Sequence, residues 1–259
     1  MRTLRTIAVT FAQYSRIPMP RFDWKDEDMR YSMAVFPWVG AVIGALVYLW
    51  HMVCTHFEVP SAAGAMIMAA IPLIVTGGFH VDGFMDVSDA RSSYGSREEK
   101  LRILKDPHIG AFAVIRLAIA GLIYLASLII LSGDREAVLA VCLGFFFARA
   151  LSALAVLSFK SARHEGMLFY EAGTASEGRK GNLIINGIWI AGCAALMMWA
   201  GGYAGSIAVC TAILTFWYYR RMTDREFGGI TGDTAGWFVT VCEVAMAAAA
   251  ALYVMVQSR

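Results

Sequence analysis

Three aspartates in the segment GGFHVDGFMDVSD, residues 77–89, have the spacing of a metal site. Asp82, Asp86 and Asp89 stand at i, i+4 and i+7, so on a helix their carboxylates share one face. Like charges on one face repel each other, which favours a bound cation. Carboxylate oxygens without a nearby Cys, or a His pair at ligand spacing, are typical of hard Mg²⁺, with Mn²⁺ as the alternative, rather than zinc. We therefore predict these three aspartates as metal ligands.

The residues around the aspartates favour chemistry over a merely solvated, charged helix face, which is the commonest explanation of such a pattern. His80 lies two residues before the cluster, and glycines at positions 77, 78 and 83 let backbone approach a ligand closely. A basic run follows, made of Arg91, Arg97, Lys100, Arg102 and Lys105. Carboxylates for metal and cations for phosphate in one loop suit phosphoryl or phosphodiester transfer, because that reaction depends on positioning and charge neutralisation.

Further candidate residues lie in other connections and at the ends of apolar segments. Those expected to bind substrate or phosphate are Lys105, His108, Arg116, Arg149, Arg163, Gly232 and Asp233. Arg116 and Arg149 fall within apolar segments, where an unpaired Arg costs at least about 2.5 kcal/mol, so a snorkelling side chain or an anionic partner is expected. The stretch GGITGDTAG, residues 228–236, is typical of a tight turn, and Glu243 adds a carboxylate further along the chain.

The composition indicates a membrane protein. Of 259 residues, 58% are hydrophobic and only 16% are charged. Apolar windows of about 17 to 25 residues, long enough to cross hydrocarbon, lie at 31–53, 62–79, 111–131, 137–157, 183–201, 203–219 and 237–256. We expect an all-α, polytopic transmembrane helix bundle with about seven spans, formed by one domain over residues 1–259. Residues 1–17 precede it as an interfacial amphipathic helix that ends before Pro18.

The distribution of Lys and Arg predicts the orientation. Nearly all of them fall before the first span or in the connections 80–110, 158–182 and 220–236, so these segments are expected in the cytoplasm together with the N-terminus. The formal net charge of +2 gives no reason to invoke nucleic acid. The five cysteines are scattered without a C-x-x-C pair, which predicts neither disulfides nor a zinc site.

Three stretches resemble the signatures of one enzyme family. GGFHVDGFMDVSD, KDPHIG at 105–110 and GGITGDTAG look like those of cobalamin synthase, the adenosylcobinamide-GDP ribazoletransferase family, and the opening FAQYSRIPMP is similar to its N-terminal segment. The resemblance runs from about Phe11 to Glu243. Ala90-Arg91 departs from the family, in which glycine often follows the last aspartate.

The resemblance implies an activity and a location. The family joins α-ribazole or its 5'-phosphate to the corrinoid of adenosylcobinamide-GDP and releases GMP, with Mg²⁺ required, in the last steps of adenosylcobalamin (vitamin B12) synthesis. It implies a multi-pass protein of the cytoplasmic (inner) membrane of a prokaryote, with the active site facing the cytoplasm. His80, Asp82, Asp86 and Asp89 match the family's active-site motif. Our own inference from imidazole chemistry makes His80 the general base.

Two other functions were weighed, and the oligomeric state stays open. A CDP-alcohol phosphotransferase of phospholipid synthesis would use a similar aspartate-rich site, but its D-x-x-D-G-x-x-A-R pattern is not met, because Phe84-Met85-Asp86 follows Gly83. A secondary transporter would hold its acidic residues near the bilayer midplane, whereas these lie in expected loops on one side. The sequence therefore favours the transferase.

Overall fold

The computed structural model describes residues 2–162, 173 and 178–257, and these residues form a helical protein. In chain order its helices are α1 (Arg2–Tyr14), α2 (Asp26–Met29), α3 (Ser32–His56), α4 (Ser61–Thr76), α5 (Phe79–Ser92), α6 (Arg97–Ile103), α7 (Ala111–Leu131), α8 (Arg135–Ser158), α10 (Arg179–Ala200), α11 (Gly202–Glu226) and α12 (Gly232–Gln257). Within this described part, extended segments pair at a single parallel bridge, between Ser161 and Ile230. The all-α class expected from the sequence is confirmed.

Several helices are long and apolar enough to cross a membrane. Among the described residues, five helices pass this test of length and composition, namely α3, α7, α8, α10 and α12. A sixth crossing results if α4 and α5 count as one broken span, with 94° between them. The protein is a polytopic helix bundle. The windows predicted at 62–79 and 203–219 correspond to α4 and α11, neither of which passes the test alone, so the count of seven and the orientation of the N-terminus stay predictions.

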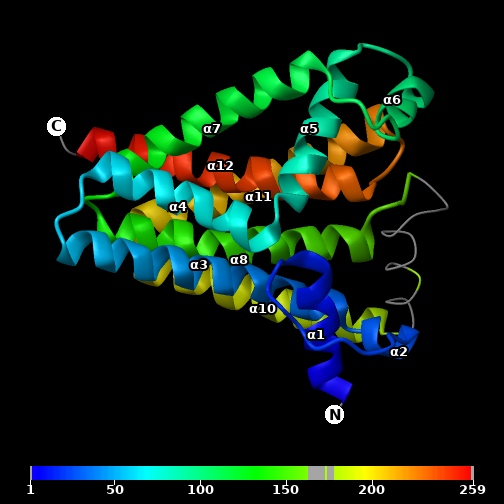
Figure 1. Ribbon diagram of the computed structural model, residues 1–259, viewed down its shortest axis with the longest axis horizontal. Coiled ribbons are helices and arrows are strands. Elements are labelled where there is room, and N and C mark those ends of the chain that lie inside the picture. Colours follow the sequence, from blue (N-terminus) through cyan, green and yellow to red (C-terminus); the bar gives the residue numbers. More distant parts are fainter. Residues whose placement is uncertain (1, 163–172, 174–177, 258–259) are drawn as a thin grey trace.

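The segments that carry the candidate site residues lie toward one end of the bundle. Figure 1 shows the long helices running along the longest axis of the molecule, with α1 crossing them. The N-terminus, α5, α6 and the connection between α11 and α12 lie toward one end, and the C-terminus lies at the other. The aspartate segment and the Gly-rich turn therefore share an end, as the distribution of charge predicts.

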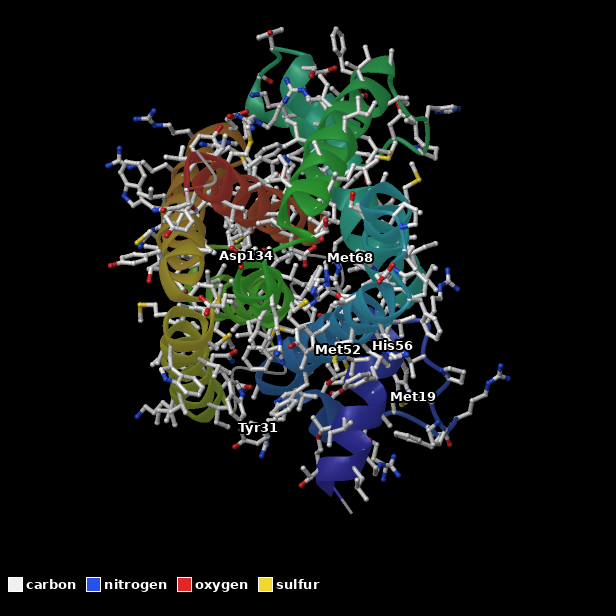
Figure 2. The ribbon with its side chains drawn as sticks, turned by 90° about the vertical axis from the view of Figure 1, so that its left-hand side faces the viewer. Met19, Tyr31, Met52, His56, Met68 and Asp134 are labelled. Carbon is white, nitrogen blue, oxygen red and sulfur yellow. The ribbon has the colours of Figure 1, made fainter. Side chains whose placement is uncertain are left out.

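Helix α8 is the most buried spanning helix, with 78% of its apolar window covered. Viewed along the bundle in Figure 2, from the end at which Asp134 lies, α8 is in the middle and the other long helices surround it. Its contact with α3 is close, because a Cβ on Gly40 would collide with the backbone of Phe145. Small residues at such crossings let backbones approach within a membrane.

Polar side chains attach α10 to α3 where a proline interrupts the helical hydrogen bonds. Pro37 has no N–H, so the carbonyl of Met33 lacks its usual donor four residues on. The side chain of Asn186, which is fully buried, donates to that carbonyl at 3.2 Å. One turn further, Trp189 Nε1 donates to the carbonyl oxygen of Ala34 at 3.1 Å. These hydrogen bonds satisfy backbone carbonyls, for which the hydrocarbon of a membrane offers no donor.

The amphipathic helix predicted at the N-terminus is present as α1. Its inward residues Val9 and Phe11 are buried. Arg5 attaches it to α2 through two hydrogen bonds of 3.0 Å to Asp28, and the same guanidinium lies 4.3 Å from the centre of the Phe22 ring. Its position in the membrane interface stays a prediction.

Candidate active site

Helix α5 carries the aspartates and leaves α4 at nearly a right angle. Two consecutive glycines in the left-handed region make this turn, Gly77 at φ 65° and Gly78 at φ 80°. The N–H of Gly78 donates to the carbonyl of Leu73 at 3.1 Å, as at other helix ends that close with glycine. These glycines therefore redirect the chain so that α5 can pack across the end of the bundle.

The three aspartates share one side of α5, as their spacing predicts. Asp82 is exposed, and Asp86 and Asp89 are half-buried. The opposite side of the helix is buried against the bundle and includes His80 and Phe84. At 100° per residue, His80 lies about 120° to 180° around the helix from each aspartate. The histidine and the carboxylates of this motif thus lie on different sides of α5, as their spacing on a helix requires.

A fourth carboxylate joins this group from the beginning of α12. Gly83 packs against the backbone of Asp233, because a Cβ on Gly83 would lie 2.7 Å from the Asp233 carbonyl oxygen. The two helices are also close one turn away, where a Cβ on Gly236 would lie 3.1 Å from the His80 carbonyl oxygen. Glycine on both helices therefore brings α5 and α12 together and sets Asp233 beside the motif.

The charges at this site repel each other. Burial raises the pKa of Asp86 to about 6, and three neighbouring carboxylates add to the rise. In order of effect, these neighbours are Asp82, Asp233 and Asp89. A carboxylate whose pKa is raised by burial and by neighbouring negative charge is a frequent mark of a functional site.

The second signature segment contacts the first. Gly110, which ends the connection from α6 to α7, lies against the carboxylate of Asp89, and a Cβ at this position would collide with both carboxylate oxygens. His108 faces solvent, with its side chain 89% exposed, and its Nδ1 lies 2.7 Å from a carboxylate oxygen of Asp106. Lys105 is exposed in the same connection.

The Gly-rich turn presents the N-terminus of α12 to the same site. Gly228 and Gly229 have positive φ, 77° and 151°. Thr231 and Thr234 then cap the helix reciprocally: Thr234 Oγ1 accepts from the Thr231 N–H at 2.8 Å, and Thr231 Oγ1 accepts from the Thr234 N–H at 3.1 Å. A helix N-terminus attracts anions, and Gly232, the first residue of α12, is exposed there.

The arginines that were expected to bind substrate or phosphate lie in different surroundings. Arg149 is 1% exposed and pairs with Glu243 at 2.6 Å, so its charge is neutralised within the bundle. Arg116 is half-buried one and a half turns into α7, and no ion pair of Arg116 is present among the described residues. Arg163 lies outside the described residues. The anionic partner that a buried arginine requires is therefore found for Arg149, and it is Glu243.

Sequence reasoning missed the role of Glu226. This carboxylate binds Arg91 at 3.0 Å and Lys100 at 2.8 Å, two members of the basic run assigned to phosphate binding. Arg91 also donates to the hydroxyl of Tyr218 at 2.8 Å. These contacts tie α5 and α6 to the end of α11, immediately before the Gly-rich turn. No short-range pattern signals a pairing across more than 120 residues.

The His80 ring borders a small cavity. It is 5% exposed and lies 5.8 Å from the Phe36 ring, and neither ring nitrogen has a hydrogen-bond partner in the described part of the chain. Burial, together with the charge of Arg149, holds the pKa of His80 well below its ordinary value. The cavity beside it measures about 60 Å³ and is also lined by Ser152 and Gly236. A space of this size accommodates a water or a hydroxyl group.

The donor set suits a hard divalent cation, although the carboxylates are not yet arranged around one. Four aspartates offer only oxygen, which Mg²⁺ prefers. Across the residues that the structure describes, no three His, Cys, Asp or Glu side chains lie close enough to ligate a single ion. Ion binding would require these carboxylates to turn toward each other. Burial and then the repulsion of neighbouring carboxylates raise the pKa of Asp86, and a cation would remove that repulsion.

The fold and the site define a polytopic membrane protein with a carboxylate-rich site at one end of its bundle. The chain matches the family model described as cobalamin-5-phosphate synthase over residues 6–251, and it belongs to that family. No solved structure matches it significantly.

Named relatives agree with this family over nearly the whole chain. A protein of Lachnoclostridium phytofermentans named adenosylcobinamide-GDP ribazoletransferase is 35% identical over 94% of this chain and 92% of its own length. Proteins with the same name from Clostridium perfringens strain 13 and Pseudomonas fluorescens strain SBW25 are 31% and 29% identical. These alignments cover 92% and 95% of this chain, and 94% and 98% of the two relatives.

Proposed function

We propose that this protein is an Mg²⁺-dependent adenosylcobinamide-GDP ribazoletransferase. It joins α-ribazole, or its 5'-phosphate, to the corrinoid phosphate and releases GMP. The observation that carries this proposal is the grouping of Asp233 with the three α5 aspartates at an end of the bundle. Burial, with the charges of these neighbours, raises the pKa of Asp86 there to about 6. Family membership supplies the substrates.

The reaction breaks the phosphoanhydride bond of a pyrophosphate and forms a phosphodiester bond. A ribose hydroxyl that α-ribazole and its 5'-phosphate share attacks the corrinoid-side phosphorus of the pyrophosphate and gives up its proton as it does so. A new oxygen–phosphorus bond forms there, and the bond to the bridging oxygen of GMP breaks with its electron pair. A bound Mg²⁺ would neutralise charge on the phosphates. Asp82, Asp86, Asp89 and Asp233 would hold it, and Mn²⁺ is the alternative ion.

Cations and backbone donors of this chain would hold the pyrophosphate. The N-terminus of α12 is exposed at Gly232 beside Asp233, and this end of a helix favours anions. Arg116, with no ion pair among the described residues, is our first choice of side chain, followed by Lys105 and His108 in the preceding connection. Arg149 would act indirectly, since Glu243 already neutralises it.

The proposed location is the cytoplasmic (inner) membrane of a prokaryote, with the active site toward the cytoplasm. The bacterial relatives and the concentration of Lys and Arg at the site-bearing end support this orientation. A homo-oligomer is compatible with the fold and is left to measurement.

The test is an assay of purified, detergent-solubilised protein with adenosylcobinamide-GDP and α-ribazole. GMP and the joined corrinoid should appear in equal amounts, and neither should form without α-ribazole. Release of CMP from a CDP-alcohol, or uptake of a solute into proteoliposomes without GMP release, would instead indicate the two rejected functions.

A further inference from the structure

A groove between α1, α3 and α10 has no part in the proposed reaction. Its first section encloses about 840 Å³ and its second about 480 Å³. Trp38 and Trp189 line both sections, so the two adjoin at these side chains. The groove follows α3 and α10 along the bundle.

The groove is polar at one end and apolar along its length. Arg30 and Tyr31, at the beginning of α3, line the first section near its polar end, and Thr3 and Thr6 of α1 add hydroxyl groups. Further along α3 the lining residues are apolar, ending in this section at Val42. This order matches an amphipathic ligand whose polar end lies at the site-bearing end of the bundle.

The length of the first section matches one leaflet. From Tyr31 to Val42 the helix rises about 16 Å at 1.5 Å per residue. Half of the hydrocarbon core, about 30 Å thick, is about 15 Å. A lipid that stands in the leaflet with its headgroup beside Tyr31 would therefore reach Val42 with the ends of its acyl chains.

The charges at the mouth favour an anionic headgroup. Arg30 and Glu27 both line it. The beginning of α10 lies against this arginine, because a Cβ on Gly178 would be 2.9 Å from Arg30 Cγ. The next two residues, Arg179 and Lys180, are exposed cations. Within the described part of the chain, these cations complement the phosphodiester of a lipid headgroup.

The floor of the groove is a fixed aromatic cluster. The rings of Trp38 and Trp189 meet edge to face at 5.4 Å, and Phe146 lies 5.8 Å from Trp38. Trp189 is further held by its hydrogen bond to Ala34. Because these rings are positioned by the protein, the groove is formed before any ligand enters.

We propose that this groove binds one glycerophospholipid from the leaflet at the site-bearing end. Its phosphate lies at the mouth beside Arg30, and an acyl chain passes Val35 and Trp38 to reach Val42. The site is separate from the carboxylate cluster, and its occupancy does not depend on the proposed reaction.

Native mass spectrometry of the purified protein, released from nanodiscs of phosphatidylglycerol, tests the proposal. Val35→Trp fills the first section of the groove, whereas Leu122→Trp adds the same side chain on α7, at a position that is 68% exposed. The wild-type protein and Leu122→Trp should each retain one phospholipid, and Val35→Trp should lose at least about 90% of that occupancy. Equal retention by all three proteins would overturn the proposal.

Two further arms separate the alternatives. Val42→Trp should repeat the loss if Val35→Trp folds poorly, as judged by its unfolding temperature. Phosphatidylglycerol should bind at least about tenfold better than diacylglycerol with the same chains, and Arg30→Gln should remove that preference. Equal binding of the two lipids would contradict the phosphate site, and a dimer that Val35→Trp dissociates would assign the groove to a second copy of the chain.

Discussion

The carboxylate of Asp89 lies directly against the α-carbon of Gly110. This contact joins the last aspartate of α5 to the connection that leads into α7, and it leaves no room for a side chain at position 110. Together with the packing of Gly83 on Asp233, it makes three separate segments of the sequence into one site. Glycine at these positions therefore sets where the carboxylates stand.

Gly110→Ala should reduce turnover by about tenfold or more, because the added methyl group would displace the carboxylate of Asp89. The backbone itself would tolerate alanine, since φ is −81°. GMP release by the purified variant is the measurement. Gly121→Ala is the matched control, since a Cβ there meets nothing within 4 Å, and it should retain full activity. Normal turnover in Gly110→Ala would mean that the position of Asp89 does not matter to the reaction.

The fold class was predictable from the sequence, and so was the gathering of the site segments at one end of the bundle. Both depend on hydrophobic windows and Lys/Arg counts, which are properties of local composition. The α5 face was predictable from spacing alone. The entry of Asp233 into the carboxylate group was not, since it depends on two glycines that let α5 and α12 approach. Charge pairing across the chain was equally hidden, so Arg91 was expected to bind phosphate but instead binds Glu226.

We expect the ion pair of Arg149 and Glu243 to stabilise the fold rather than to contact the substrate. Removing one partner of a buried ion pair leaves an uncompensated charge, which costs about 3 to 5 kcal/mol. Glu243→Gln and Arg149→Met should therefore each lower the unfolding temperature in detergent, and the double variant should recover part of the loss. If Arg149→Met instead keeps its stability and only raises the Michaelis constant for adenosylcobinamide-GDP, the arginine contacts the substrate.

The ion pairs of Glu226 should make stability depend on pH. Burial would raise the pKa of Glu226, but its bonds to Lys100 and Arg91 outweigh burial and hold the pKa below the ordinary value. Such a carboxylate stabilises the fold above the unfolded-state pKa, about 4.3, and loses that effect as pH falls through the folded-state pKa. At pH 7 the free energy of unfolding of the wild-type protein should exceed that of Glu226→Gln by about 1 kcal/mol. The unfolding temperatures of the two proteins should converge near pH 3. A constant difference across this range would exclude the ion pairs as its cause.

The rate of His80→Ala as a function of pH tests whether this residue is the general base. Its ring faces the bundle, away from the aspartates, and borders a cavity of only about 60 Å³. We therefore expect a lower rate from lost packing with the acidic limb of the profile retained. Loss of that limb in His80→Ala, and not in His108→Ala, would restore His80 as the base.

The dependence of GMP release on Mg²⁺ tests the central claim, that Asp86 and Asp233 belong to one cation site. Asp233→Asn and Asp86→Asn should each reduce turnover by about 100-fold or raise the Mg²⁺ concentration for half-maximal rate at least tenfold. Asp224→Asn, which changes an exposed aspartate on α11, is the control and should behave as wild type. Wild-type protein should release no GMP in a chelator, and addition of Mg²⁺ should restore it. Full activity of wild-type protein in the chelator, or unchanged Mg²⁺ dependence in Asp233→Asn, would contradict this account.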